Sequence, residues 1–232
     1  MRCALLAWLA LLAGRATLAG GADAPTLPWP DTQFSRLQAL ALLQTLNSEL
    51  LSHDSATLTL EHWCGSHHLA DPARVIAQRV TGVDKPAGEE QRRLLQVDAT
   101  EPVHYRRVQL MCGAVVLSQA DNWYVPARLS HEMNTELESS DTPFGKVVGP
   151  LHFQRHTLSA TLLWQPLPES WASAQTPARA PRVDEKGRLA VPNAVLEHRA
   201  VLTRADGTPF SEVVETYTGN VLAFPMPLED PK

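Results

Sequence analysis

The stretch from residue 103 to 149 constrains the fold most strongly, because it combines a strand pattern, a turn and a second strand in direct succession. Residues 104–112 alternate with a period of two, which is typical of a β-strand. Gly113 suits a tight turn, and 114–125 has the pattern of a returning strand. Pro126 ends that strand because proline has no N–H to give to a ladder. The stretch therefore predicts an antiparallel β-hairpin.

Helical patterns precede this hairpin and strand patterns follow it. Apolar residues recur at helical spacing up to residue 51 from a cap at Asp31 or Thr32, and a second helix is expected from about residue 55 to 64. Ser130 is a typical N-cap for a short helix after the hairpin. Alternation at 151–164 and at 197–218 then predicts further strands. The sequence therefore predicts an α+β fold with an antiparallel sheet, N-terminal helices and one intervening helix.

The first 24 residues have the composition of a signal peptide. Arg2 is followed by an apolar run at 4–13, and small residues at 17–19 supply a cleavage site. The apolar run is too short to span a membrane comfortably, which favours a cleaved signal peptide. No stable membrane span is then expected in the mature protein. The alternative is an uncleaved N-terminal anchor. The sequence therefore predicts a periplasmic or secreted protein.

The rest of the chain is interpreted as one domain with a leader and a tail. Residues 25–31 form a proline-rich leader, and 32–224 form the domain, which is long enough to bury a core. Residues 165–193, rich in alanine and proline, are expected to be a long loop inserted in the domain. Residues 225–232 are expected to be a loose tail.

Two cysteines remain once the signal peptide is removed. Cys64 and Cys112 both lie near the ends of predicted elements. An even pair of cysteines in an exported chain favours a disulfide. The alternative is two separate buried thiols, because free cysteine packs well in a core.

Charge and motifs exclude several classes of function. The chain has 20 Lys and Arg against 25 Asp and Glu, a net charge of −5, with no basic run, so no nucleic-acid partner is expected. It lacks a phosphate-binding loop, a dinucleotide-binding glycine motif and a nucleophile elbow, so no cofactor is expected. His67 and His68 are adjacent and point apart in an extended segment, so no metal site is expected.

Arg106 breaks the usual pattern of its strand. It is in phase with Val108 and Leu110, so its guanidinium is directed toward the apolar side of the sheet. A buried guanidinium is costly unless an anion meets it. That anion is either an internal Asp or Glu or the carboxylate of a bound ligand.

Five motifs in order carry a resemblance to a known family. They are L-L-x-x-D-S-x-T-x-x-x-E at 50–61, R-x-V-x-L at 106–110, the strand end V-P at 125–126, T-P-F-G at 142–145, and G-T-P followed by glutamates at 207–215. This order resembles the bacterial chorismate pyruvate-lyases. The resemblance implies the chorismate lyase fold and a small aromatic carboxylate, of the chorismate or 4-hydroxybenzoate type, as the partner.

The resemblance also implies a set of site residues. By position it assigns ligand binding to the strand arginine Arg106, or to Arg107 if the register slips, and to the backbone at Phe144 in the turn. It also assigns ligand binding to Arg155 on a later strand, and to Glu212 as the alternative to Glu215. It assigns catalysis to Arg106 and Glu215. Because Glu212 and Glu215 are three residues apart in a strand, only one of them can face the site.

The implied reaction is the elimination of pyruvate from chorismate, which gives 4-hydroxybenzoate. A fixed guanidinium would orient the substrate, and a protonated glutamate would assist the departing oxygen. The chain departs from the family in three ways: it has a predicted signal peptide, it carries Asp121 where lyases commonly carry a basic residue, and its 165–193 insertion has no counterpart there. Two other hypotheses stay open: a non-catalytic binder of a small aromatic carboxylate, and a structural or interaction protein that has lost the site.

Overall fold

The computed structural model describes residues 26–168, 171 and 187–227. The predicted signal peptide, most of the predicted 165–193 loop and residues 228–232 lie outside these residues. In the described part of the chain, no helix is both long and apolar enough to cross a membrane.

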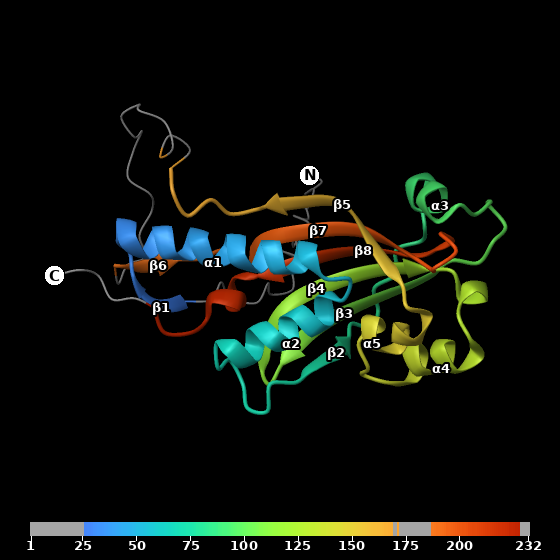
Figure 1. Ribbon diagram of the computed structural model, residues 1–232, viewed down its shortest axis with the longest axis horizontal. Coiled ribbons are helices and arrows are strands. Elements are labelled where there is room, and N and C mark those ends of the chain that lie inside the picture. The colour runs from blue at the N-terminus through green and yellow to red at the C-terminus, as the bar shows by residue number, and fades with distance from the viewer. Residues whose placement is uncertain (1–25, 169–170, 172–186, 228–232) are drawn as a thin grey trace, which may run out of the picture.

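A six-stranded antiparallel sheet is the centre of the fold (Figure 1). Its strands, in spatial order, are β2 (Val75–Arg79), β3 (His104–Cys112), β4 (Val115–Tyr124), β8 (Pro209–Thr218), β7 (Ala194–Thr203) and β5 (Gln154–Leu162). The predicted hairpin is confirmed, since β3 pairs with β4, and β7 and β8 form a second antiparallel hairpin. Gly113 and Gly207 have positive φ in the two turns, which is why glycine suits these positions.

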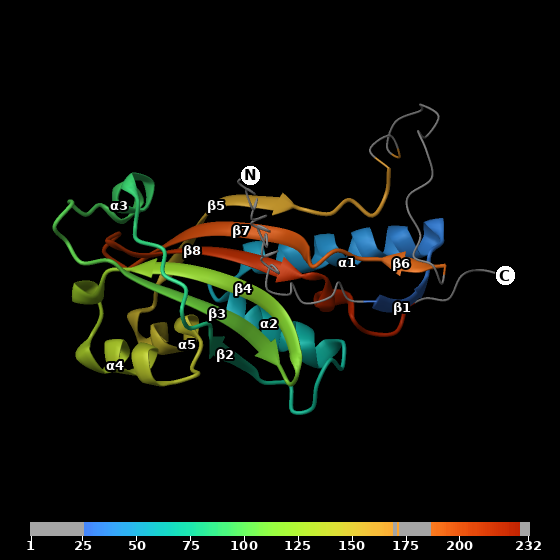
Figure 2. The same ribbon diagram turned by 180° about the vertical axis from the view of Figure 1, so that it is seen from behind.

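Helices α1 (Gln33–Ser52), α2 (Ala56–Ser66), α4 (His131–Ser139) and α5 (Phe144–Val147) lie on the inner face of this sheet, and α3 (Glu89–Leu95) lies on the opposite face. Short 3-10 turns lie at Pro126–Arg128, Gly149–Leu151 and Gly219–Leu222. The N-caps of the helices include Thr32, Ser55 and Ser130, whose hydroxyl oxygens accept backbone N–H groups of the first turns. α1 and α2 lie across the inner face, and Figure 2 shows the opposite face with α3 at one end. The expected α+β class is confirmed.

The segment expected to be a leader is part of the core. It forms strand β1 (Thr26–Pro30), which pairs with β6 (Arg188–Ala190) in a small second sheet. Leu27 and Trp29 are buried and the prolines between and after them are exposed. The segment therefore alternates between buried and exposed side chains, as a β-strand does, although it is rich in proline. The Trp29 indole N–H donates to the Phe224 carbonyl at 2.6 Å. The domain therefore begins earlier than residue 32.

The C-terminal boundary also differs in detail. Phe224 is buried in the main core, and Met226, inside the segment expected to be loose, packs against that core. The Ser35 hydroxyl lies 3.4 Å from the Met226 sulfur. Only the part of the tail before residue 228 is described, and that part is attached to the domain.

Most buried apolar side chains lie between α1, α2 and the inner face of the sheet. A second cluster surrounds Phe144, Phe210 and Tyr124 at the end of the sheet near α4 and α5. A third, with Leu95 and Trp123, lies on the opposite face under α3.

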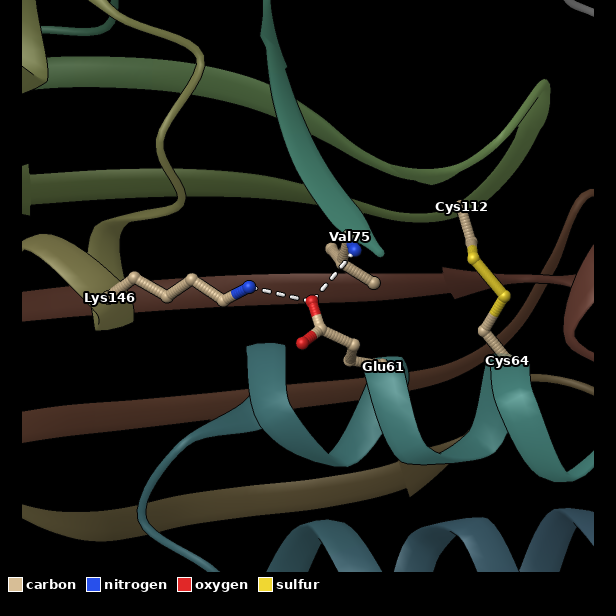
Figure 3. The surroundings of a disulfide bond; sticks show 5 residues. All are labelled: Glu61, Cys64, Val75, Cys112 and Lys146. Carbon is tan, nitrogen blue, oxygen red and sulfur yellow. Dashed lines mark hydrogen bonds and ion pairs between the residues drawn. A yellow bond between two sulfur atoms is a disulfide. The ribbon is translucent and has the colours of Figure 1, made fainter. Parts of the chain in front are cut away.

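The two cysteines are joined. Cys64 of α2 and Cys112 of β3 form a disulfide, with an S–S distance of 1.98 Å and a Cα–Cα distance of 6.5 Å (Figure 3). The bond fastens the covering helix α2 to the sheet.

Candidate functional site

A small cavity lies between the first turn of α2, the start of α5 and the inner face of the sheet. Its walls are mostly apolar and include Val108, Leu110, Phe144, Phe153 and Leu202. Four charged side chains also line it: Asp54, Arg106, Arg155 and Glu215. Its volume of about 40 Å³ is room for a few water molecules.

Arg106 lies on β3 and points into this cavity, as its phase with Val108 and Leu110 predicted. It is 5% exposed. Its Nη2 donates to the Thr142 carbonyl at 3.3 Å, and its Nε has no hydrogen-bond partner. No acidic side chain among the described residues forms an ion pair with it. The buried guanidinium is therefore a cation without a counter-ion inside the described part of the protein.

The surroundings of Arg106 disfavour its charge. Burial lowers the pKa of Arg106 to about 10, and the nearby Arg79 lowers it further, against opposing effects of Tyr124 and Asp141. With a pKa of about 10 the side chain remains cationic at pH 7. A buried charge held in this way is stabilised by any anion that enters the cavity.

The first turn of α2 contributes a second element favourable to an anion. Ser55, Ala56 and Thr57 line the cavity beside Arg106. The Ser55 hydroxyl accepts the N–H of Leu58 at 3.4 Å, and the first N–H groups of a helix have no acceptor within the helix. The positive end of an 11-residue helix and an unpaired guanidinium thus line the same space.

Arg155 and Glu215 form an ion pair on another wall. Arg155 Nη2 lies 2.6 Å from Glu215 Oε2, and both side chains are almost fully buried. The Tyr217 hydroxyl donates to the same oxygen at 3.2 Å. Arg155 Nε has no partner, so one donor of this buried guanidinium is still unsatisfied.

Two residues of the predicted site lie elsewhere. Arg107 is on the opposite face of the sheet, where its Nη2 donates to Gln119 at 3.0 Å. Glu212 is also on that face, buried and paired with Arg199 at 2.6 Å. Arg107 and Glu212, the two alternative choices, therefore do not line this cavity, because side chains of a strand alternate between its two faces.

The remaining predicted residues come together. Arg106, Phe144, Arg155 and Glu215 all line the one cavity. Across the sheet, β4 separates the strand of Arg106 from that of Glu215, which places the two strands roughly 10 Å apart.

The turn at Phe144 is held against α2 at two points. A Cβ on Gly145 would lie 3.2 Å from the Ser55 hydroxyl, so the close approach of α5 to the first turn of α2 suits glycine. One turn further along α2, Glu61 Oε2 accepts from Lys146 Nζ at 2.6 Å and from the Val75 N–H at 2.9 Å (Figure 3). These contacts fix the relative positions of α2, α5 and β2 around the cavity.

Sequence reasoning missed the contribution of the α1–α2 connector. Asp54 Oδ1 accepts the backbone N–H of Arg155 at 2.8 Å, which ties the start of α2 to β5. The pair Asp54-Ser55 was recognisable as a helix start and as part of the motif at 50–61, but neither signal assigned it to the site. An open groove of about 530 Å³ lies on the outer side of the same connector, and Asp54 and Ser55 line both spaces.

His198 is buried beside the Arg155–Glu215 ion pair, on β7 opposite Glu215. It is fully buried on β7, its Nε2 is 2.8 Å from Asn47 Oδ1, and its Nδ1 has no partner. Burial lowers the pKa of His198 to about 4, with Glu215 opposing this effect and Arg155 adding to it.

This shift predicts a loss of stability in acid. The unfolded chain binds a proton near pH 6.5, but the folded chain resists it until about pH 4, so stability falls as pH drops between these values, by up to roughly 3 kcal/mol. Denaturant unfolding of the native protein and of His198→Gln at pH 7 and pH 4.5 measures the effect. The variant should lose less stability than the native protein on acidification, and an equal loss would contradict this origin.

No cluster of three or more His, Cys, Asp or Glu side chains that could hold a metal ion occurs within residues 26–168, 171 and 187–227. The adjacent His67 and His68 belong to no such cluster. His67 stacks on Phe224 with ring centroids 4.2 Å apart, which is a packing role.

Comparison with solved structures finds bacterial regulators among similar chains. The effector domain of PhnF from Mycobacterium smegmatis is 14% identical, with a TM-score of 0.46, and the match covers 76% of this chain and 96% of that one. A possible transcriptional regulator, YydK, from Bacillus subtilis is 13% identical, with a TM-score of 0.38, over 68% of this chain. The match covers 62% of YydK, so this chain spans less than two thirds of that regulator's length.

Comparison of sequences gives a much stronger match. No protein-family model matches the chain. The protein named "Uncharacterized protein y4mC" from Sinorhizobium fredii (strain NBRC 101917 / NGR234) is 54% identical over 206 residues, which cover 88% of this chain and 85% of that protein. At this identity and coverage, the chain belongs to the same protein family as y4mC of Sinorhizobium fredii.

Proposed function

We propose that this protein is a chorismate lyase-like domain that binds a small aromatic carboxylate at Arg106. The observation that carries the proposal is the buried guanidinium of Arg106, which has an unsatisfied Nε and no acidic partner among the described residues. A protein that used this arginine only for structure would be expected to pair it, because an unpaired buried charge is costly. A carboxylate ligand supplies the missing charge and accepts two hydrogen bonds from a guanidinium.

The other walls of the cavity suit the rest of such a ligand. The rings of Phe144 and Phe153 and the side chains of Val108 and Leu202 offer apolar surface to an aromatic ring. The unsatisfied Nε of Arg155 offers one donor to an oxygen at the opposite end of the ligand. The chemistry fits 4-hydroxybenzoate, with its carboxylate at Arg106 and its hydroxyl oxygen at Arg155.

The cavity must widen to hold such a ligand. At about 40 Å³ it is smaller than an aromatic ring requires, whereas the neighbouring groove has about 530 Å³. Only the connector at Asp54 and Ser55 is shared by the two spaces. We infer that the ligand enters from the groove when this connector moves outward.

Pyruvate elimination from chorismate is the alternative function, supported by the order of motifs and by the presence of Arg106 and Glu215 on one cavity. The chemistry needs a glutamic acid that is free to donate a proton. Here Glu215 Oε2 is occupied by Arg155 at 2.6 Å and by the Tyr217 hydroxyl at 3.2 Å. This arrangement favours a binding protein over a lyase.

Calorimetric titration of the purified domain with 4-hydroxybenzoate tests the proposal. Neutral 4-hydroxybenzamide is the matched control, since it has the same ring and hydroxyl but no charge for Arg106. We expect measurable binding of the acid and at least tenfold weaker binding of the amide. Equal affinities for the acid and the amide would refute the role of Arg106. If the acid gives no binding heat, the hypothesis of a structural or interaction protein remains. Incubation with chorismate, followed by a pyruvate assay, should show no turnover; pyruvate release would establish the lyase instead.

We also propose that the protein is exported. The signal-peptide pattern of residues 1–24 motivates this, and the Cys64–Cys112 disulfide supports it, because disulfides persist in oxidising compartments outside the cytoplasm. Fusion of the chain to a reporter that is active only outside the cytoplasm tests export. Reporter activity should be lost when residues 1–24 are deleted, and activity that does not depend on them would contradict the proposal.

A further inference from the structure

We propose that the Glu215–Arg155 ion pair restricts the cavity to ligands with a single negative charge, so that Glu215 determines charge specificity. The inference rests on the proposed function, since it concerns the same cavity. It goes further in naming the class of ligand: small organic monoanions are accepted and dianions, including dicarboxylates such as chorismate, are rejected.

The charges on the cavity walls lead to this conclusion. Arg106 is unpaired among the described residues, and Arg155 is paired with Glu215 at 2.6 Å. Asp54, the fourth charged residue, is exposed at the connector and accepts a backbone N–H from Arg155. The buried walls therefore offer one uncompensated positive charge, reinforced by the positive end of α2.

A second carboxylate on the ligand would find no cation of its own. With one anionic group at Arg106, a second group reaching toward the opposite wall would meet the Glu215 carboxylate and the Arg155 guanidinium that Glu215 already neutralises. Two carboxylates that share one arginine repel each other, and each loses its hydration. A neutral hydroxyl or carbonyl oxygen avoids this repulsion and can still accept from Arg155 Nε.

The opposite face of the sheet supplies a matched control. Glu212 and Arg199 also form a pair at 2.6 Å, with the Glu212 side chain fully buried and Arg199 also bonded to Glu90. Neither Glu212 nor Arg199 lines the cavity. A substitution at Glu212 therefore removes a buried strand carboxylate from an arginine without changing the charge of the cavity walls.

Two para-substituted benzoates of different charge make the test. 4-Hydroxybenzoate carries one charge at pH 7, and benzene-1,4-dicarboxylate replaces its hydroxyl with a second carboxylate. The native protein should bind the monoanion at least 100-fold more tightly. Glu215→Gln frees Arg155, so this variant should gain at least tenfold in affinity for the dicarboxylate. Glu212→Gln should keep the native preference.

Each result decides between the two proposals. If the native protein binds both ligands within threefold of each other, charge selection is refuted and the proposed function stands. If it binds neither ligand, the proposed function fails. If a folded Glu215→Gln protein, checked by circular dichroism, keeps the native preference, the role of Glu215 is refuted. If that variant does not fold, the selectivity of the native protein alone decides whether the cavity excludes dianions.

Discussion

Replacing Arg106 with methionine should abolish anion binding and at the same time stabilise the fold. The guanidinium is 5% exposed, with one hydrogen bond of 3.3 Å and no ion pair among the described residues. Methionine keeps most of the apolar stem and removes a charge that folding must strip of water. We expect a loss of at least 100-fold in affinity for 4-hydroxybenzoate, and a gain of about 1–3 kcal/mol in the free energy of unfolding. Calorimetry and denaturant unfolding measure the two quantities.

Arg107→Met is the control for this prediction. Arg107 is the next residue of the same strand, but it faces away from the cavity and donates to Gln119. Its replacement should leave anion affinity unchanged and cost less than about 1 kcal/mol. Lower stability in Arg106→Met with binding intact would show that Arg106 serves the fold and that no ligand depends on it.

Removal of the disulfide should cause the largest loss of stability. Cys64 and Cys112 are separated by 48 residues, and closing a loop of that length in the unfolded chain corresponds to about 4 kcal/mol in the chain-entropy model. The double variant Cys64→Ala, Cys112→Ala should lose an amount of this order, and denaturant unfolding measures it. Its α2 helix remains attached through Glu61, Lys146 and Val75, so we expect a folded but weaker domain.

A dithiol reductant separates the bond from the side chains. Reduction should lower the stability of the native protein toward that of the double variant, and it should not affect the variant. A change of less than 1 kcal/mol on reduction of the native protein would mean that the bond is not formed, or that the unfolded chain is already compact in this region.

The candidate site was predicted well where it depends on strand periodicity. The phase of Arg106 with Val108 and Leu110 placed it on the apolar face, and the structure confirms that face. The choice between Glu212 and Glu215 could not be made in advance. Periodicity states that the two face opposite sides, but only the register of β8 against β4 decides which side holds the cavity.

Two other features depend on contacts that a single sequence does not report. Residues 25–31 look like a leader because of their prolines, but β6, about 160 residues later, gives β1 a strand to pair with. The cap at Ser55 was visible, but the space that the first turn of α2 faces is set by the packing of α2 on the sheet. Local chemistry predicts that a helix begins; tertiary packing decides what its end can bind.

The position of β1 has a consequence for how the chain acquires its final form. The Trp29 indole N–H donates a hydrogen bond to the carbonyl of Phe224, 195 residues away, and β1 pairs with a strand near residue 189. Contacts between such distant parts of a chain form slowly, because a long loop must close first. Strand β1 can therefore pair with β6 only after nearly the whole polypeptide has been synthesised. We therefore expect Trp29 of a nascent chain to lack this hydrogen-bond partner until residue 224 has been synthesised.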